Sequence, residues 1–185
     1  ALKVNTTLAG VELRENHLDG ESIAELLEVN TTLTELTLSG NELVEDECEL
    51  IAEALKKNTA IYCLGLRMND FTEYGLECLA DMLLVNTSIT MIDLSRNDFH
   101  SVESLANALS LNTTVTHLRL EVLEPDRECI YHIAEMLKKN TTLTTINLRL
   151  CVEESPIADN AGMQHFTDAL KVNATLLSIH LDLYS

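Results

Sequence analysis

Residues 30–43 of the chain read Asn-Thr-Thr-Leu-Thr-Glu-Leu-Thr-Leu-Ser-Gly-Asn-Glu-Leu, and variants of this stretch recur along the whole sequence. Each copy opens on an asparagine, called here the anchor asparagine, which is followed six residues later by an apolar–x–apolar triplet. The anchors are Asn5, Asn30, Asn58, Asn86, Asn112, Asn140 and Asn173. Successive anchors are 25 to 33 residues apart. A repeat of this length predicts a solenoid, because one unit cannot bury its apolar face alone.

Each unit predicts a helix that ends at the anchor asparagine. A leucine stands three residues before every anchor, and apolar residues stand six and seven residues before most of them. These offsets place the apolar side chains on one stripe of an α-helix. We expect the anchor to end the helix in the left-handed conformation, which asparagine tolerates better than most residues do.

A short strand and a turn are predicted after each anchor, since β-branched residues lead into the apolar triplet. Eleven residues past four of the anchors stands a second asparagine: Asn16, Asn41, Asn69 and Asn97. Because an amide donates and accepts at once, these side chains are expected to form a hydrogen-bonded ladder between stacked turns. The ladder should break at Leu123, with a helix starting at Pro125, and residues 153–160 should form a protruding loop.

Strands joined by helices in this way are expected to be parallel, with right-handed connections. Strands pack about 4.8 Å apart, whereas helices need roughly 8 to 10 Å, so the array must curve with its strands on the inside. The sequence therefore predicts one α/β solenoid domain over residues 1–185. It should have about seven strands, a parallel sheet on the concave face and helices on the convex face.

The pattern Leu-x-x-Leu-x-Leu-x-x-Asn-x-Leu is intact over residues 33–43, and helical segments ending in AELLEVN or AEALKKN accompany it. This combination resembles the leucine-rich repeats of the ribonuclease-inhibitor type, which implies a right-handed α/β horseshoe. The last two units, with AEMLKKNTTL and KVNATLLSIHL, are also similar to the C-terminal repeats of tropomodulin. The wider family includes inhibitors, GTPase-activating proteins, innate-immune sensor domains and actin-capping tropomodulins.

The formal charge of −18 argues against binding to nucleic acid or to an anionic membrane, since both require a basic surface. The sequence contains no apolar run long enough to span a membrane. Five cysteines without CxxC spacing predict reduced, buried thiols and a cytoplasmic location. Six anchors match the N-glycosylation pattern, but the repeat itself generates that match, so we expect them to be unmodified.

Side chains alternate along a strand, so the residues between and beside the apolar pair should face the concave surface. All five basic residues at these positions are arginines, and arginine is favoured in protein interfaces whereas lysine is depleted. We therefore predict that a protein partner binds this face. The candidate residues are Glu12, Arg14, Glu35, Arg67, Met68, Met91, Asp93, Arg96, His117, Arg119, Glu121 and Arg149.

Two interpretations of the arginines remain open. Arg67, Arg96, Arg119 and Arg149 could form a stripe that binds acidic side chains of a partner, with Met68 and Met91 as apolar contacts. Alternatively, Arg96 and Arg119 could pair with Asp93 and Glu121 on adjacent strands and only balance charge within the sheet.

We do not expect an enzyme, since the sequence contains no P-loop, GxGxxG or HExxH motif. Asp93 and His117 should lie diagonally on neighbouring strands, and His117 and His180 should be about 10 Å apart, so neither a catalytic dyad nor a metal site is expected. No cofactor is expected. The alternatives to a general binding scaffold are a regulator of a small GTPase and a tropomodulin-like actin-binding module.

The two ends of the sequence lack the polar capping unit that a solenoid needs for solubility. Leu2 matches the last helical turn of the next unit, and the sequence stops directly after the last predicted strand. We therefore expect a fragment of a longer array, or self-association through the open ends.

Overall fold

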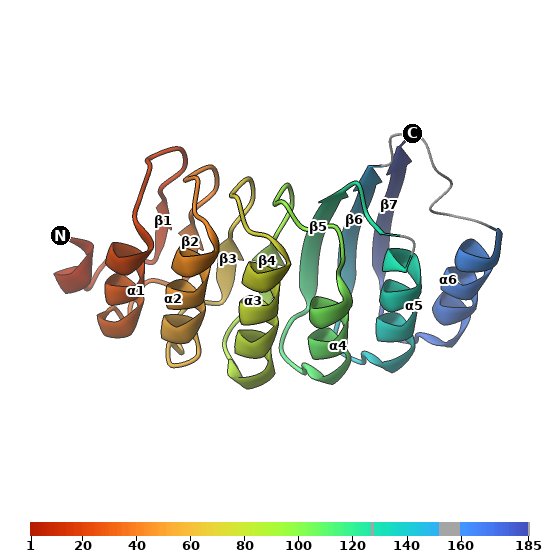
Figure 1. Ribbon diagram of the computed structural model, residues 1–185. Coiled ribbons are helices and arrows are strands. Elements are labelled where there is room, and N and C mark those ends of the chain that lie inside the picture. Colours follow the sequence, from red (N-terminus) through yellow and green to blue (C-terminus); the bar gives the residue numbers. More distant parts are fainter. Residues whose placement is uncertain (127, 152–159, 185) are drawn as a thin grey trace.

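The computed structural model describes residues 1–126, 128–151 and 160–184 (Figure 1). Within them, seven strands form one parallel sheet whose spatial order is the order of the sequence. The strands are β1 (Gly10–Glu12), β2 (Glu35–Thr37), β3 (Cys63–Gly65), β4 (Met91–Asp93), β5 (His117–Leu123), β6 (Thr145–Cys151) and β7 (Ser178–Tyr184). The predicted α/β fold with a parallel sheet is thereby confirmed.

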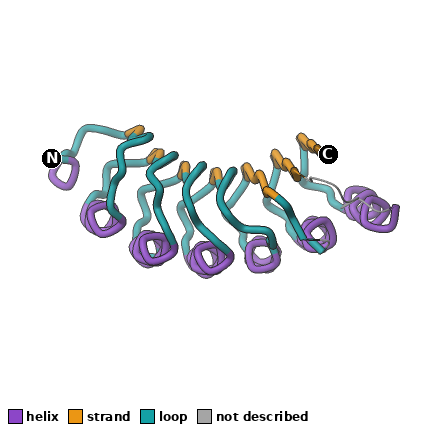
Figure 2. Tube along the Cα trace, turned by 45° about the horizontal axis from the view of Figure 1, so that its top comes forward, coloured by secondary structure: helices purple, strands orange, loops and turns teal. Residues whose placement is uncertain are grey.

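A helix precedes each strand and covers one face of the sheet. The helices are the short 3₁₀ segment η1 (Leu2–Val4), then α1 (Gly20–Val29), α2 (Glu45–Leu55), α3 (Glu73–Val85), α4 (Glu103–Leu111), α5 (Cys129–Lys139) and α6 (Asn160–Val172). Figure 2 shows the strands on the inner side of a shallow arc and the helices on its outer side. The loop predicted over residues 153–160 lies outside the described residues, except for Asn160, where α6 begins.

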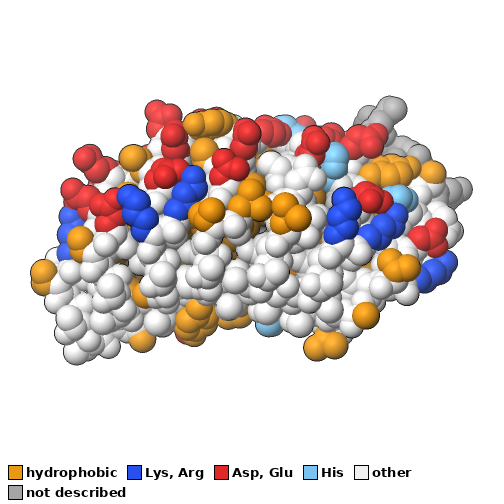
Figure 3. Space-filling view, turned by 90° about the horizontal axis from the view of Figure 1, so that it is seen from below, with side chains coloured by type: hydrophobic (Ala, Val, Ile, Leu, Met, Phe, Trp, Pro, Cys, Tyr) orange, Lys and Arg blue, Asp and Glu red, His pale blue; other side chains and the backbone are white. Residues whose placement is uncertain are grey.

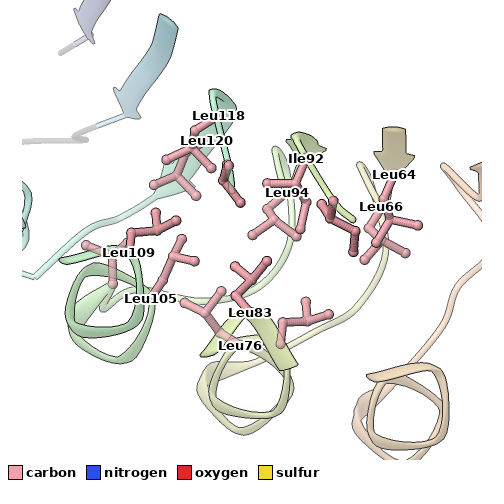
Figure 4. Close-up of a cluster of buried hydrophobic side chains, with 14 of the residues drawn as sticks. Leu64, Leu66, Leu76, Leu83, Ile92, Leu94, Leu105, Leu109, Leu118 and Leu120 are labelled. Atoms are coloured by element: carbon pink, nitrogen blue, oxygen red, sulfur yellow. The ribbon is translucent and has the colours of Figure 1, made fainter. Parts of the chain in front are cut away.

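Leucines from the strands and helices form one continuous core. Leu38, Leu66 and Leu94 are fully buried, and Leu120 is 2% exposed. All belong to a single cluster that runs through the repeats. In Figure 4, the strand leucines point towards Leu76, Leu83, Leu105 and Leu109 on the helices. The predicted phase of the repeat is therefore correct, which fixes the side chains that face the concave surface.

The anchor asparagines do not adopt the left-handed conformation that the sequence suggested. Asn86, for example, has φ −70° and ψ 133°, which is extended. Its Oδ1 accepts hydrogen bonds from the backbone N–H of Ser88 (2.9 Å) and Ile89 (2.8 Å). Its Nδ2 donates to the carbonyls of Leu55 (2.8 Å) and Asn58 (3.1 Å) in the preceding unit. The anchor therefore connects two repeats instead of only ending a helix.

The same contacts argue against glycosylation at four of the six anchors that match the pattern. Asn30, Asn86, Asn112 and Asn140 are between 3% and 7% exposed, and each donates from its amide nitrogen to a backbone carbonyl of the preceding unit. An oligosaccharide on such a nitrogen would break these bonds and could not be accommodated in the core.

The second asparagine ladder is present where it was predicted. The Oδ1 of Asn69 accepts from the N–H of Asn41 (3.0 Å) and Leu43 (3.2 Å), and its Nδ2 donates to the carbonyls of Leu38 (3.2 Å) and Leu66 (3.1 Å). One buried side chain thus satisfies four backbone groups of two adjacent turns.

The ladder ends at Leu123 because the strands become longer there. β1 to β4 each have three residues, whereas β5, β6 and β7 each have seven, and Leu123 pairs with Cys151 in the sheet. In the earlier units the chain turns with a left-handed residue, such as Met68 or Arg96, both at φ 57°. The following helix, α5, begins at Cys129 and not directly after Pro125, which corrects the predicted start.

His100 stabilises the end of the first long strand. Its Nδ1 lies 3.1 Å from the carbonyl oxygen of Leu123 and 3.2 Å from that of Glu124, so the ring nitrogen donates to them. The hydrogen bond to Leu123 raises the pKa of His100 above its ordinary value of 6.5, and the carboxylates of Glu73 and Asp98 act in the same direction.

Replacing Asn69 with alanine should destabilise the fold by about 2 to 4 kcal/mol, because buried backbone groups lose their partners. Asn16→Ala is the matched control. Asn16 occupies the same position at the exposed end of the ladder, so its loss should cost less than about 0.5 kcal/mol. Urea unfolding followed by circular dichroism measures both. Equal losses for the two variants would contradict the structural role given to the ladder.

The contribution of His100 to stability should depend on pH. Because folding raises its pKa, the contribution is complete below 6.5 and is lost as pH rises through the raised value. The melting temperatures of the wild type and of His100→Gln should therefore differ more at acidic than at alkaline pH. A difference that is constant, or that grows with pH, would show that the charge on His100 has no such effect.

Candidate functional site

The inner face of the arc contains a groove of about 650 Å³ that crosses the strands. Gly65 deepens it at β3, because a Cβ atom there would approach the Thr37 side chain to 3.1 Å. The residues that line it with side chains facing away from the core are Arg14, Thr37, Ser39, Cys63, Arg67, Met91, Asp93, His117, Arg119, Thr145, Asn147, Ser178 and His180.

Half of the predicted partner-binding residues line this groove. They are Arg14, Arg67, Met91, Asp93, His117 and Arg119. The structure does not bring Glu12, Glu35, Met68, Arg96, Glu121 and Arg149 into its lining. Met68 and Arg96 follow their strands in left-handed turns, so they lie beyond the end of the strand and not on it. The part that these two residues play in partner binding stays a prediction.

Two arginines neutralise the buried carboxylate of Glu121. Its side chain is 9% exposed, and its oxygens lie 3.2 Å from Nε of Arg96 and 3.6 Å from a guanidinium nitrogen of Arg149. Arg149 also lies 3.2 Å from Asp182 on β7. A buried carboxylate requires compensating charge. Arg96 and Arg149 therefore have a structural role, as the charge-balancing interpretation predicted for Arg96.

Arg119 is paired only weakly. Its guanidinium lies 3.9 Å from Asp93, the residue directly opposite it on β4, and its side chain is 69% exposed. Exposed pairs of this kind contribute less than about 1 kcal/mol, so Arg119 can exchange Asp93 for another acid at little cost. Asp93 itself accepts a hydrogen bond from the backbone N–H of Ser95 at 3.1 Å.

Arg67 is the most available cation of the groove. It is partly buried at the end of β3, and the structure gives its guanidinium neither an ion pair nor a hydrogen bond within the described residues. Met68 follows it in the chain and is 47% exposed, and Met91 lines the same groove. Arg67 and Met91 thus give the groove a cation and an apolar side chain.

Two polar pairs on this face were not anticipated from the sequence. The hydroxyl of Tyr62 donates to the Glu35 carboxylate, and this bond raises the pKa of Tyr62. His180 lies 3.0 Å from Asp182 on the same strand. Burial opposes ionisation of Asp182, but hydrogen bonds from His180 and Arg149 outweigh it and lower the Asp182 pKa. The signal was available, since alternate residues of one strand share a face.

The groove residues considered for catalysis have other partners. His117 contacts the hydroxyl of Thr116 at 2.9 Å, while Asp93 pairs with Arg119 and Ser95, so the diagonal pair is not joined. Burial raises the pKa of the Cys63 thiol, which makes it a poor nucleophile. A search of the described residues finds no cluster of three or more metal-binding side chains. None of the described helices is long and apolar enough to cross a bilayer.

Comparison with solved structures places this architecture. The chain is similar to the actin-binding site 2 of leiomodin-1, with a TM-score of 0.64 and 23% identity over 82% of this chain and 87% of that one. These are leucine-rich-repeat-like folds. The chain is also similar to the C-terminal domain of tropomodulin from Caenorhabditis elegans, with a TM-score of 0.52 and 16% identity over 93% and 88% of the two chains.

The predicted similarity to tropomodulin is therefore confirmed for the fold, and the assignment to the ribonuclease-inhibitor type stays a prediction. No protein-family model matches the sequence, and no curated protein matches it either. At this level of identity, the similarity establishes the fold and leaves the partner to be argued from the surface.

Mutation of an arginine that is paired with buried Glu121 should affect stability more than mutation of Arg67. Arg149→Ala should destabilise the fold by about 1 to 3 kcal/mol, because Glu121 and Asp182 lose a counter-charge. Arg67→Ala should change stability by less than about 0.5 kcal/mol. Urea unfolding of both variants provides the measurement. If Arg149→Ala is as stable as the wild type, the paired arginines do not support the sheet.

Proposed function

We propose that the chain is a protein-binding module and that its partner is actin or a subunit that resembles actin. The observation that carries this proposal is the similarity to the actin-binding site 2 of leiomodin-1, which covers most of both chains. The tropomodulin C-terminal domain supports the same fold group. An actin-binding module similar to tropomodulin was one of the alternatives that the sequence suggested, and the similarity to these two structures favours it.

The concave groove is the proposed contact surface. It is long and crosses six strands, β2 to β7, and its lining combines arginines, hydroxyls and a methionine, which suits the side chains of a protein better than one small molecule. Of the four arginines first considered, Arg67 and Arg119 are proposed to bind acidic side chains of the partner. Arg96 and Arg149 are committed to Glu121 and would act only by holding the strands in register.

The proposed class is a binding protein and not an enzyme. The net charge of −18 argues against nucleic acid and anionic membranes as partners. Five free cysteines suit a reducing compartment, so we propose a cytoplasmic location. No specific observation favours regulation of a small GTPase, which stays an alternative prediction, as does self-association through the ends.

Cosedimentation with filamentous actin and a pointed-end elongation assay test this function. The wild type should bind, and the double variant Arg67→Ala/Arg119→Ala should bind at least about tenfold more weakly, the effect of losing 1.4 kcal/mol or more. The matched control is Lys56→Ala/Lys57→Ala, which removes the same charge from the end of α2.

The possible results test two claims separately, namely that actin is the partner and that the concave groove is the contact surface. A wild type that neither sediments with actin nor alters elongation would refute actin as the partner. Binding that is unaffected by the arginine variant, or reduced equally by the lysine control, would refute the concave groove as the contact surface.

A further inference from the structure

A second groove lies on the outer side of the arc, between α3 and α4. Its volume is about 550 Å³, and it is separate from the concave surface because the sheet and the core lie between them. Its lining residues belong to α3, to α4 and to the segment just before α4.

The groove exists because the facing side chains are small. Ala80 on α3 faces the space shared with Ser104 and Ala108 on α4. Larger groups cross other seams between helices. At the α2–α3 seam, Tyr74 donates to Glu49 at 3.0 Å, and at the α5–α6 seam the rings of Tyr131 and His165 are 5.3 Å apart. The α3–α4 seam has no such filling among the residues that line it.

One end of the groove is apolar and exposed. Leu84 is 49% exposed and Leu111 is 74% exposed, and the adjacent Val85 is 56% exposed. Figure 3, a view from below, shows several exposed hydrophobic side chains between two groups of basic side chains. Aliphatic side chains that are exposed next to one another mark a contact surface more often than scattered ones do.

The rest of the groove is lined by acidic side chains. It contains four carboxylates and no basic residue, namely Glu73, Glu77, Asp81 and Glu103. Glu73 accepts from the backbone N–H of His100 at 2.8 Å. Within the described part of the chain, the other three have neither an ion pair nor a hydrogen bond from their side chains. The ammonium of Lys56 is hydrogen-bonded to Glu53 and also interacts electrostatically with Asp81.

We infer that this groove is a second binding site, for a short cationic amphipathic segment of a partner protein. Aliphatic side chains of the segment would cover Leu84, Val85 and Leu111, and its lysines or arginines would reach the carboxylates at the other end. The nine residues of α4 make the groove roughly 13 Å long. That length matches two to three turns of a helix lying in a groove.

The charges distinguish this occupant from others. An anionic membrane or a nucleic acid would be repelled by the four carboxylates. A second copy of the chain would have to present a cationic, apolar surface, while the whole molecule carries −18. The basic side chains of such a segment would neutralise the carboxylates, which repel one another. Its apolar side chains would at the same time cover the exposed leucines.

Fluorescence anisotropy with a labelled model peptide tests the site. The probe is a peptide of about 14 residues, made only of leucine and lysine and spaced to give one apolar helical face. The groove variant Glu77→Gln/Asp81→Asn/Glu103→Gln should weaken binding at least about tenfold at physiological salt. Leu84→Ser/Leu111→Ser should also weaken it, and the exposure of both leucines predicts that this variant folds.

The matched control removes three acids elsewhere, as Glu21→Gln/Glu42→Gln/Asp46→Asn on and beside α1 and α2, and should bind within about twofold of the wild type. Equal losses in the control and groove variants would show attraction to the overall charge and overturn the proposal. Unchanged binding in the leucine variant would overturn the apolar half of the contact.

Carbodiimide cross-linking of the peptide to the wild type needs no variant. Cross-links that map by mass spectrometry to Glu77, Asp81 and Glu103 support the site, whereas cross-links spread over α1 and α2 overturn it. Sedimentation of the chain alone provides the last check, because a dimer that the groove variant abolishes would make a second copy the occupant. None of these results depends on whether the concave groove binds actin.

Discussion

Buried asparagine amides hold each repeat to the one before it. In a solenoid, the backbone at both rims has polar groups that neither the strand ladder nor the helix can satisfy. The anchors satisfy them on one rim, where the amide oxygen accepts from the anchor's own unit and the amide nitrogen donates to the preceding unit. Asn41, Asn69 and Asn97 satisfy them on the other rim, where the oxygen accepts from the preceding unit and the nitrogen donates to carbonyls of the preceding unit and of its own. The leucine core supplies the free energy of burial, and the amides fix the register in which it is buried.

That register determines the surface. Because the strands stack without offset, Glu121 comes directly opposite Arg149, and Arg149 comes opposite Asp182. Charges are thereby aligned in rows across the sheet, and rows that contain both signs neutralise themselves. Arg67 escapes this because its neighbours in the row on β2 and β4 are Ser39 and Ser95, which offer no carboxylate. The guanidinium of Arg67 stays available because no neighbouring strand places an acidic residue beside it.

The sequence was sufficient to predict the core and the concave side chains, since both depend on a period of two along strands that repeat in phase. It was misleading for the anchors, because asparagine is suited both to a left-handed helix end and to the extended bridge that Asn86 makes. The choice depends on a carbonyl in another repeat. The difference in strand length was not predicted, because a three-residue strand and a seven-residue strand look alike in the repeat until pairing ends. The α3–α4 groove could not be foreseen, since it depends on small residues of two different helices meeting.

The change in strand length divides the molecule by the way in which its turns are held. β5, β6 and β7 pair over seven residues each, whereas β1 to β4 pair over three. In the first four units, left-handed turn residues and buried asparagine amides connect the backbone beyond the strands. The outer turn of an early unit is therefore specified by single side chains, whereas a late unit depends on backbone pairing, which most residue types can supply. Tolerance to sequence change at that rim should thus differ between the two ends of the ribbon.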